Sequence, residues 1–279
     1  MRLNRSGWML AVVLLSAGFV YAHMSLFLIQ FVFHVRVPVN LFNQCAELLR
    51  FIGFPVRINL MLLLVGSTLL CSLAVAVREG IAAYRWNRTE RSRLDEELTL
   101  AVGEEHGLAR ASLSILDHKD PVAMTIGLLR PRVVLSTGLI DALSETELHA
   151  VIAHEKFHLT RRHPLAIFLL SLIGIALWYI PIYRWFIRKY KVLIELMADR
   201  YAIHATGGAA PLSSALLVLL KRGQASASAV VLGSASFADN AINLRLKQLI
   251  DPQFKPSLTP PLLPCAVSAL AFAFIAFGV

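Results

Sequence analysis

The stretch from Ser144 to Thr160, SETELHAVIAHEKFHLT, carries the pattern on which the predicted fold depends. It opens with a serine three residues before a glutamate, which is the capping box found at helix starts. Apolar residues at helical spacing follow, so we expect one continuous helix. Within that helix His154 and His158 are four residues apart and lie on the same face.

The segment His154-Glu155-Lys156-Phe157-His158 is an HExxH motif. Its two imidazoles converge on one point, and Zn²⁺ favours nitrogen ligands while its catalytic sites keep one position open for water. Glu155 stands where it can reach such a water without being a ligand. The alternative is a solvated helix that carries two histidines by chance. The apolar turn from Ala150 to Ala153 argues against it, because this turn directs the histidines towards a core.

A third metal ligand is expected from the segment Glu195-Leu196-Met197-Ala198-Asp199. Glu195 and Asp199 are the only acidic residues between Glu155 and Asp239, and they lie one helical turn apart. We therefore expect Glu195 to complete the zinc site. A carboxylate beside a ligating histidine fixes its tautomer, which is the role expected for Asp199. The alternative for Glu195 is an ordinary surface carboxylate.

Three stretches outside the motif contain no Asp, Glu, Lys or Arg and are long enough to cross a bilayer: Trp8–Phe33, Ile58–Val77 and Leu262–Val279. The whole chain of 279 residues is 57% hydrophobic and only 16% charged. This composition excludes an ordinary soluble protein and a disordered one. A cleaved signal peptide is the alternative for the N-terminus, but the first apolar run is too long for its core.

A fourth apolar stretch, residues 165–182, separates the two arms of the expected metal site. One simple crossing would place His158 and Glu195 on opposite sides of the membrane. We therefore expect one helix from His158 to Ile180, a break at Pro181, and a helix that returns to Glu195. The resulting membrane-associated hairpin spans residues 165–195, and the chain has about four membrane segments.

Arginines at positions 2 and 5 precede the first span, and five more follow the second, at positions 78, 85, 88, 91 and 93. The positive-inside rule then places the N-terminus and the segment after Val77 in the cytoplasm. The formal charge of +9 is thus assigned to membrane flanks, and direct nucleic-acid binding is not expected. We expect a membrane hairpin at residues 1–77, a zinc-binding domain at 78–250, and a Pro-rich linker with the last span at 251–279.

Three short β-like runs, 112–116, 122–128 and 133–136, predict a small sheet ahead of the motif helix. Val133, Val134 and Leu135 belong to the third of these strands. We expect this strand to bind substrate by accepting a peptide strand along its edge.

The HExxH motif, the downstream Glu195 and Asp199, and the membrane spans together resemble the M56 family of membrane zinc metallopeptidases, which includes BlaR1-like β-lactam receptors. Further matching segments are Gly127–Leu135, Arg161-Arg162 after the motif, Trp178, and Ser236-Phe237 before the segment Arg245–Leu249. The resemblance covers roughly residues 90–250. His163 is a departure, because the family commonly has Asp there.

This resemblance implies a mainly α-helical integral membrane protein with four passes and a small α+β protease domain of the gluzincin type in the cytosol. It implies His154, His158 and Glu195 as Zn²⁺ ligands and Glu155 as the general base that activates water against a peptide bond. The penicillin-binding sensor of the receptors is not present in this sequence, so β-lactam sensing is not carried over.

The expected activity is regulatory, site-specific proteolysis at the cytoplasmic side of the cell membrane. Its substrate would be a protein or peptide, and a transcriptional repressor is one candidate that the resemblance suggests. Two alternatives stay open: a quality-control protease of the M48 type, and a non-catalytic membrane receptor or scaffold. A transporter is disfavoured, because the clear spans carry no charged residue.

Overall fold

The structure, a computed structural model, describes residues 3–34, 51, 58–221, 235–251, 254 and 259–276. The chain divides into two compact units. The helical unit consists of Met1–Glu79, Leu169–Ile187 and Leu258–Val279, and the sheet unit of Gly80–Phe168 and Arg188–Ser257. Several helices run from one unit into the other. The domain boundaries expected from the sequence stay predictions.

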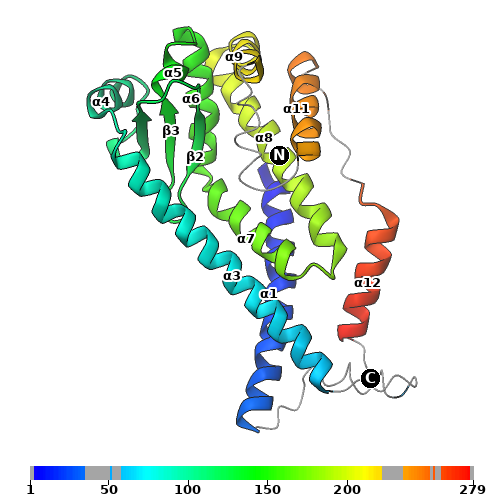
Figure 1. Cartoon of the computed structure of the whole chain (residues 1–279). Coiled ribbons are helices and arrows are strands. Elements are labelled where there is room, and N and C mark those ends of the chain that lie inside the picture. Colours follow the sequence, from blue (N-terminus) through cyan, green and yellow to red (C-terminus); the bar gives the residue numbers. More distant parts are fainter. Residues whose placement is uncertain are drawn as a thin grey trace. The chain divides into compact units, whose positions relative to one another are not determined.

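The helical unit is built from α1 (Leu3–Phe33), the first part of α3 (Ile58–Arg91), most of α7 (His163–Ala176), the start of α8 (Pro181–Thr206), and α12 (Leu262–Ala276) (Figure 1). Hydroxyl groups anchor the start of α8 to two other helices. Tyr183 donates a hydrogen bond to Ser16 on α1 at 3.1 Å, and the backbone N–H of Ile182 donates to Ser268 on α12 at 2.9 Å. Such contacts between hydroxyls and neighbouring helices are a common means of association in membranes.

Among the described residues, two helices are long and apolar enough to cross a membrane: Ser6–Phe33 within α1 and Leu62–Glu90 within α3. They overlap the first two spans expected from the sequence, but the second continues as a helix beyond Val77, where that expected span ends. The described part of α12 has 15 residues, and the last three residues of that expected span lie outside the described ones. The number of four spans therefore stays a prediction.

The prediction of one unbroken helix from His158 to Ile180 is wrong. Helix α6 ends at Thr160 and α7 begins at His163, and the two axes are bent by 60°. Pro164 explains the break, because proline lacks the N–H that a helix interior needs and is tolerated only in a first turn. Arg162, between the helices, has a φ of +51° and so turns the chain.

The second expected break is present. Helix α7 ends at Ala176, and α8 begins at Pro181, where the fixed φ of proline suits a helix start. Helix α8 returns alongside α7, and they approach closely at Gly174, where an added Cβ would meet the side chain of Ile187. Helix α8 then continues without a break through Glu195 and Asp199.

The sheet unit contains the three strands β1 (Leu113–Leu116), β2 (Ala123–Ile126) and β3 (Arg132–Ser136), in the order β1-β3-β2. Strand β3 pairs in parallel with β1 and antiparallel with β2 (Figure 1). The predicted small sheet is confirmed. Among the described residues, the other elements of this unit are the helices α4 (Glu96–Glu105), α5 (Thr137–Ile140), α6 (Glu145–Thr160), α9 (Ala210–Lys221) and α11 (Ala235–Ile250), the 3-10 turn η1 (Arg110–Ser112), the end of α3, the start of α7 and most of α8.

Helix α6 begins at the predicted capping box. The backbone N–H of Glu147 donates to the Ser144 hydroxyl at 3.4 Å, and that of Ser144 donates to the Glu147 carboxylate at 2.8 Å. The helix is buried on two sides. Leu148 and Val151 join the core of the sheet, whereas Ala150 packs with residues of α8, α9 and α11. This double burial fixes the orientation of the HExxH side chains.

We predict that Gly127→Ala destabilises the protein by about 1–3 kcal/mol, because the turn between β2 and β3 requires glycine. Gly127 has a φ of +98°, and an added Cβ would meet the carbonyl of Arg130. Thermal unfolding of the detergent-solubilised protein measures the effect. Gly80→Ala is the control, since Gly80 lies in a helix with no neighbouring atom in reach. Equal melting temperatures for the two variants would contradict this prediction.

Candidate metal and catalytic site

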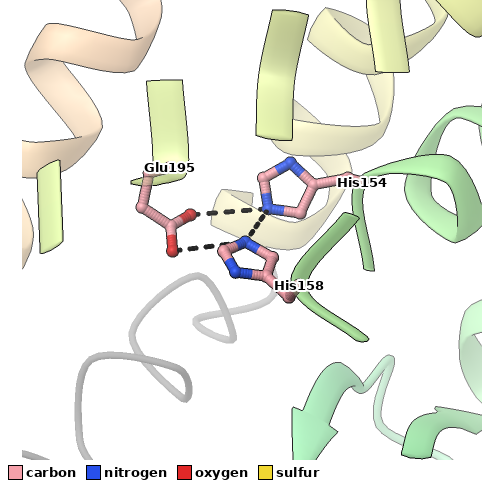
Figure 2. A group of neighbouring side chains, drawn as sticks. All are labelled: His154, His158 and Glu195. Atoms are coloured by element: carbon pink, nitrogen blue, oxygen red, sulfur yellow. Dashed lines mark hydrogen bonds and ion pairs between the residues drawn. The ribbon is translucent and has the colours of Figure 1, made fainter. Parts of the chain in front are cut away.

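Three side chains from two helices converge inside the sheet unit (Figure 2). His154 and His158 come from α6, and Glu195 from α8. The Nε2 atoms of the two histidines lie 3.2 Å apart. The Glu195 carboxylate faces both rings, with one oxygen 3.4 Å from His154 Nε2 and the other 3.6 Å from His158 Nε2.

Each histidine nitrogen lies as far from one Glu195 oxygen as two ligand atoms of a tetrahedral zinc ion lie from each other, and one donor atom from each of the three side chains lies within 4.8 Å of the others. With zinc–nitrogen and zinc–oxygen bonds of about 2.0–2.2 Å, tetrahedral ligand atoms are about 3.3–3.6 Å apart. The donor set of two imidazoles and one carboxylate is that of a catalytic zinc site, which leaves the fourth position open. Glu195 keeps 26% of its side-chain surface exposed, so the cluster is accessible from that side.

His154 is supported by a fully buried carboxylate. Its Nδ1 lies 2.9 Å from Asp199, one turn along α8 from Glu195. When Nε2 binds a metal, the one proton of the ring lies on Nδ1, where it faces this carboxylate. Asp199 thus lies beside His154, and its role in fixing the tautomer of that ring stays a prediction.

Arg245 on α11 completes this arrangement, a role that was not expected from the sequence. It donates two hydrogen bonds to Asp199, at 2.7 and 2.9 Å, and lies 3.4 Å from Glu195. Burial opposes the ionised form of Asp199, but Arg245 and His154 hold the pKa of Asp199 below its usual range. Glu195 has a lowered pKa as well, because the effects of His158, His154 and Arg245 together outweigh its burial.

The two histidines differ in their affinity for a proton. Burial disfavours a charged ring at both, but the contacts of His154 with Asp199 and Glu195 raise its pKa to about 9. Burial lowers the pKa of His158 to about 4. The carboxylates thus stabilise a positive charge at His154. The same carboxylates would stabilise the positive charge of a divalent cation bound by the cluster.

Glu155 is buried beside the cluster and held by the sheet. The hydroxyl of Thr125 on β2 lies 2.7 Å from the Glu155 carboxylate and donates a hydrogen bond to it. Burial raises the pKa of Glu155, which is the direction expected of a carboxylate that acts as a general base near neutral pH. Thr125 was not expected from the sequence, because the contact joins residues 30 positions apart.

We predict that Thr125→Val lowers kcat by about 10–100-fold, because a hydrogen bond to a charged group contributes roughly 1.5–3 kcal/mol. Zinc content should not change, since Thr125 is not part of the metal cluster. Thr125→Ser is the control and should keep most of the activity. A Val variant as active as wild type would show that Thr125 does not orient Glu155.

The strand nearest the cluster differs from the one expected to bind substrate. Val133, Val134 and Leu135 lie on β3, the central strand, and both edges of β3 are already paired. Strand β2 packs against α6, and no strand among the described residues pairs with its other edge. Strand order in a sheet is a tertiary property, so the local pattern at 133–136 does not reveal it.

A comparison with protein families agrees with this site. The family model described as BlaR1 peptidase M56 matches residues 56–249, well over half of the chain. The chain belongs to the M56 peptidase family. A comparison with curated proteins finds no match.

The matched region of this M56 peptidase runs from the start of α3 to the end of α11 and includes every residue of the cluster. The family consists of metalloproteases, and the His-His-Glu group offers a place for the metal. The two long apolar helices are consistent with a location in a membrane.

Proposed function

We propose that this M56 peptidase is a membrane-embedded zinc metalloendopeptidase. His154, His158 and Glu195 would hold the zinc ion, and Glu155 would be the general base. The observation that carries the proposal is the convergence of two imidazoles and one carboxylate, with one donor atom from each within 4.8 Å of the others, beside a buried glutamate that is not one of them.

Each side chain of the site would have a separate role in the reaction. A zinc ion held by the three ligands would supply a Lewis acid that activates water and polarises the scissile carbonyl. Glu155 would accept a proton from the attacking water and pass it to the leaving amine as the C–N bond breaks. Thr125 orients Glu155, while Asp199 and Arg245 hold His154 in the tautomer that leaves Nε2 free.

The free edge of β2 is the proposed binding surface for the substrate backbone. A peptide that adds to an exposed strand gains main-chain hydrogen bonds in an extended conformation. Because Thr125 lies on β2 and contacts Glu155, a peptide on this edge would pass close to the general base. Val133, Val134 and Leu135 would then support the site from the central strand.

We further propose a multi-pass protein in the cell membrane with its site at the cytoplasmic side. The arginines between Arg78 and Arg93 favour this orientation, because they follow the uncharged apolar stretch Ile58–Val77. The expected role is regulatory cleavage of one protein partner, for which a transcriptional repressor is a candidate.

Proteolysis by the full-length protein in lipid nanodiscs tests the proposal. We expect cleavage of extended peptides, loss of cleavage after zinc is removed with a chelator, and recovery when zinc is returned. Persistent activity without metal, or no cleavage of any peptide by zinc-loaded protein, would contradict it. The number of proteins that accumulate in cells with a Glu155→Gln variant then distinguishes the two roles. Accumulation of one protein supports regulatory cleavage, whereas accumulation of dozens indicates quality control.

A further inference from the structure

His163 lies against the second histidine of the cluster, on the edge of the ring opposite the Nε2 atom that faces His154. Its Nδ1 is 2.8 Å from Nδ1 of His158, and both side chains are buried. The break between α6 and α7 creates this contact, because it places the first residue of α7 beside the last turn of α6. Hydrogen-bond partners of this kind commonly orient the ligands of a metal site.

Two imidazole nitrogens at this distance cannot both carry a proton. If His158 binds a metal through Nε2, its proton lies on Nδ1, since a neutral imidazole has one N–H. His163 Nδ1 must then be the acceptor.

We propose that His163 is the positioning residue for His158: it accepts the Nδ1 proton and so fixes the tautomer and ring orientation of this ligand. The proposal depends on the zinc site proposed above. The two histidine ligands would then be supported differently, His154 by the carboxylate of Asp199 and His158 by a neutral imidazole. Where the family commonly has Asp, this chain uses an acceptor that adds no negative charge to the site.

His163 also has packing neighbours, so a purely structural role is the competing explanation. Its ring centroid lies 5.5 Å from that of Phe157 and 6.5 Å from that of Tyr190. Two substitutions separate the roles. His163→Phe keeps an aromatic ring but removes the acceptor, whereas His163→Asn removes the ring but keeps an acceptor atom at the position of Nδ1.

The test is the zinc dissociation constant of each full-length variant, measured by competition with a chromogenic chelator, together with the visible spectrum of the Co²⁺-substituted protein. We expect His163→Phe to bind zinc about 10–100-fold more weakly, with an altered Co²⁺ spectrum. His163→Asn should stay close to wild type in both. If His163→Phe does not fold, His163→Leu is the second variant without an acceptor.

Wild-type affinity for His163→Phe with weakened binding by His163→Asn would overturn the positioning role and indicate packing. Equal affinity of all three proteins would also overturn it. Other results would contradict the proposed function itself: wild-type protein would bind no zinc, or His154→Ala would bind zinc as tightly as wild type.

Discussion

Replacing Glu155 with glutamine should reduce peptide cleavage by about 10²–10⁴-fold while the protein keeps its zinc. Glutamine is close to glutamate in shape and can still accept the hydrogen bond from Thr125. It cannot accept a proton from water at neutral pH. Because Glu155 is not among the three clustered donors, the metal content should stay at the wild-type value.

Glu145→Gln provides the matched control for this experiment. It removes the same charge from the first turn of the same helix, where the side chain is exposed, and should leave kcat nearly unchanged. Initial rates on one peptide substrate, with zinc measured on the same samples, give both quantities. A Glu155→Gln enzyme within tenfold of wild type would show that another group accepts the proton.

Replacing Arg245 with methionine should destabilise the metal-free protein by about 3–5 kcal/mol, because the substitution removes the guanidinium that pairs with a buried carboxylate. Asp199 has no exposed side-chain surface and receives two hydrogen bonds from Arg245. For a protein of this size the loss corresponds to a fall in Tm of about 6–20 °C. Methionine keeps the apolar stem, so the loss of packing is small.

Two comparisons isolate the charge effect. Lys247→Met changes an exposed cation on the same helix and should shift Tm little. Adding Asp199→Asn to Arg245→Met should recover part of the lost stability, since the uncompensated charge is then gone. Equal losses for Arg245→Met and Lys247→Met, measured in the presence of a chelator, would contradict the importance of this ion pair.

The parts of the site that could be predicted from the sequence are those fixed by local geometry. The capping box at Ser144 and the four-residue spacing of His154 and His158 depend only on neighbouring residues in one helix. Glu195 and Asp199 could be expected to join them because no other acidic residue lies nearby in the sequence. The structure brings these side chains together on α6 and α8.

Other contacts could not be predicted, because they join elements far apart in the chain. Arg245 lies 46 positions from Asp199, and its helix gives no local indication of which carboxylate it will contact. The partner of Glu155 depends on which strand lies nearest α6, and thus on strand order. The break at Arg162, in contrast, could have been predicted from the sequence, because Pro164 indicates that a new helix starts there.

The central claim is that His158 on α6 and Glu195 on α8, which the α7–α8 turn separates in the sequence, bind one zinc ion. Metal analysis of purified wild type, His158→Ala and Glu195→Ala tests it most directly, with circular dichroism to show that each variant folds. We predict one zinc per chain in wild type and a loss of zinc from both folded variants. One zinc per chain in folded Glu195→Ala, bound as tightly as in wild type, would contradict the account.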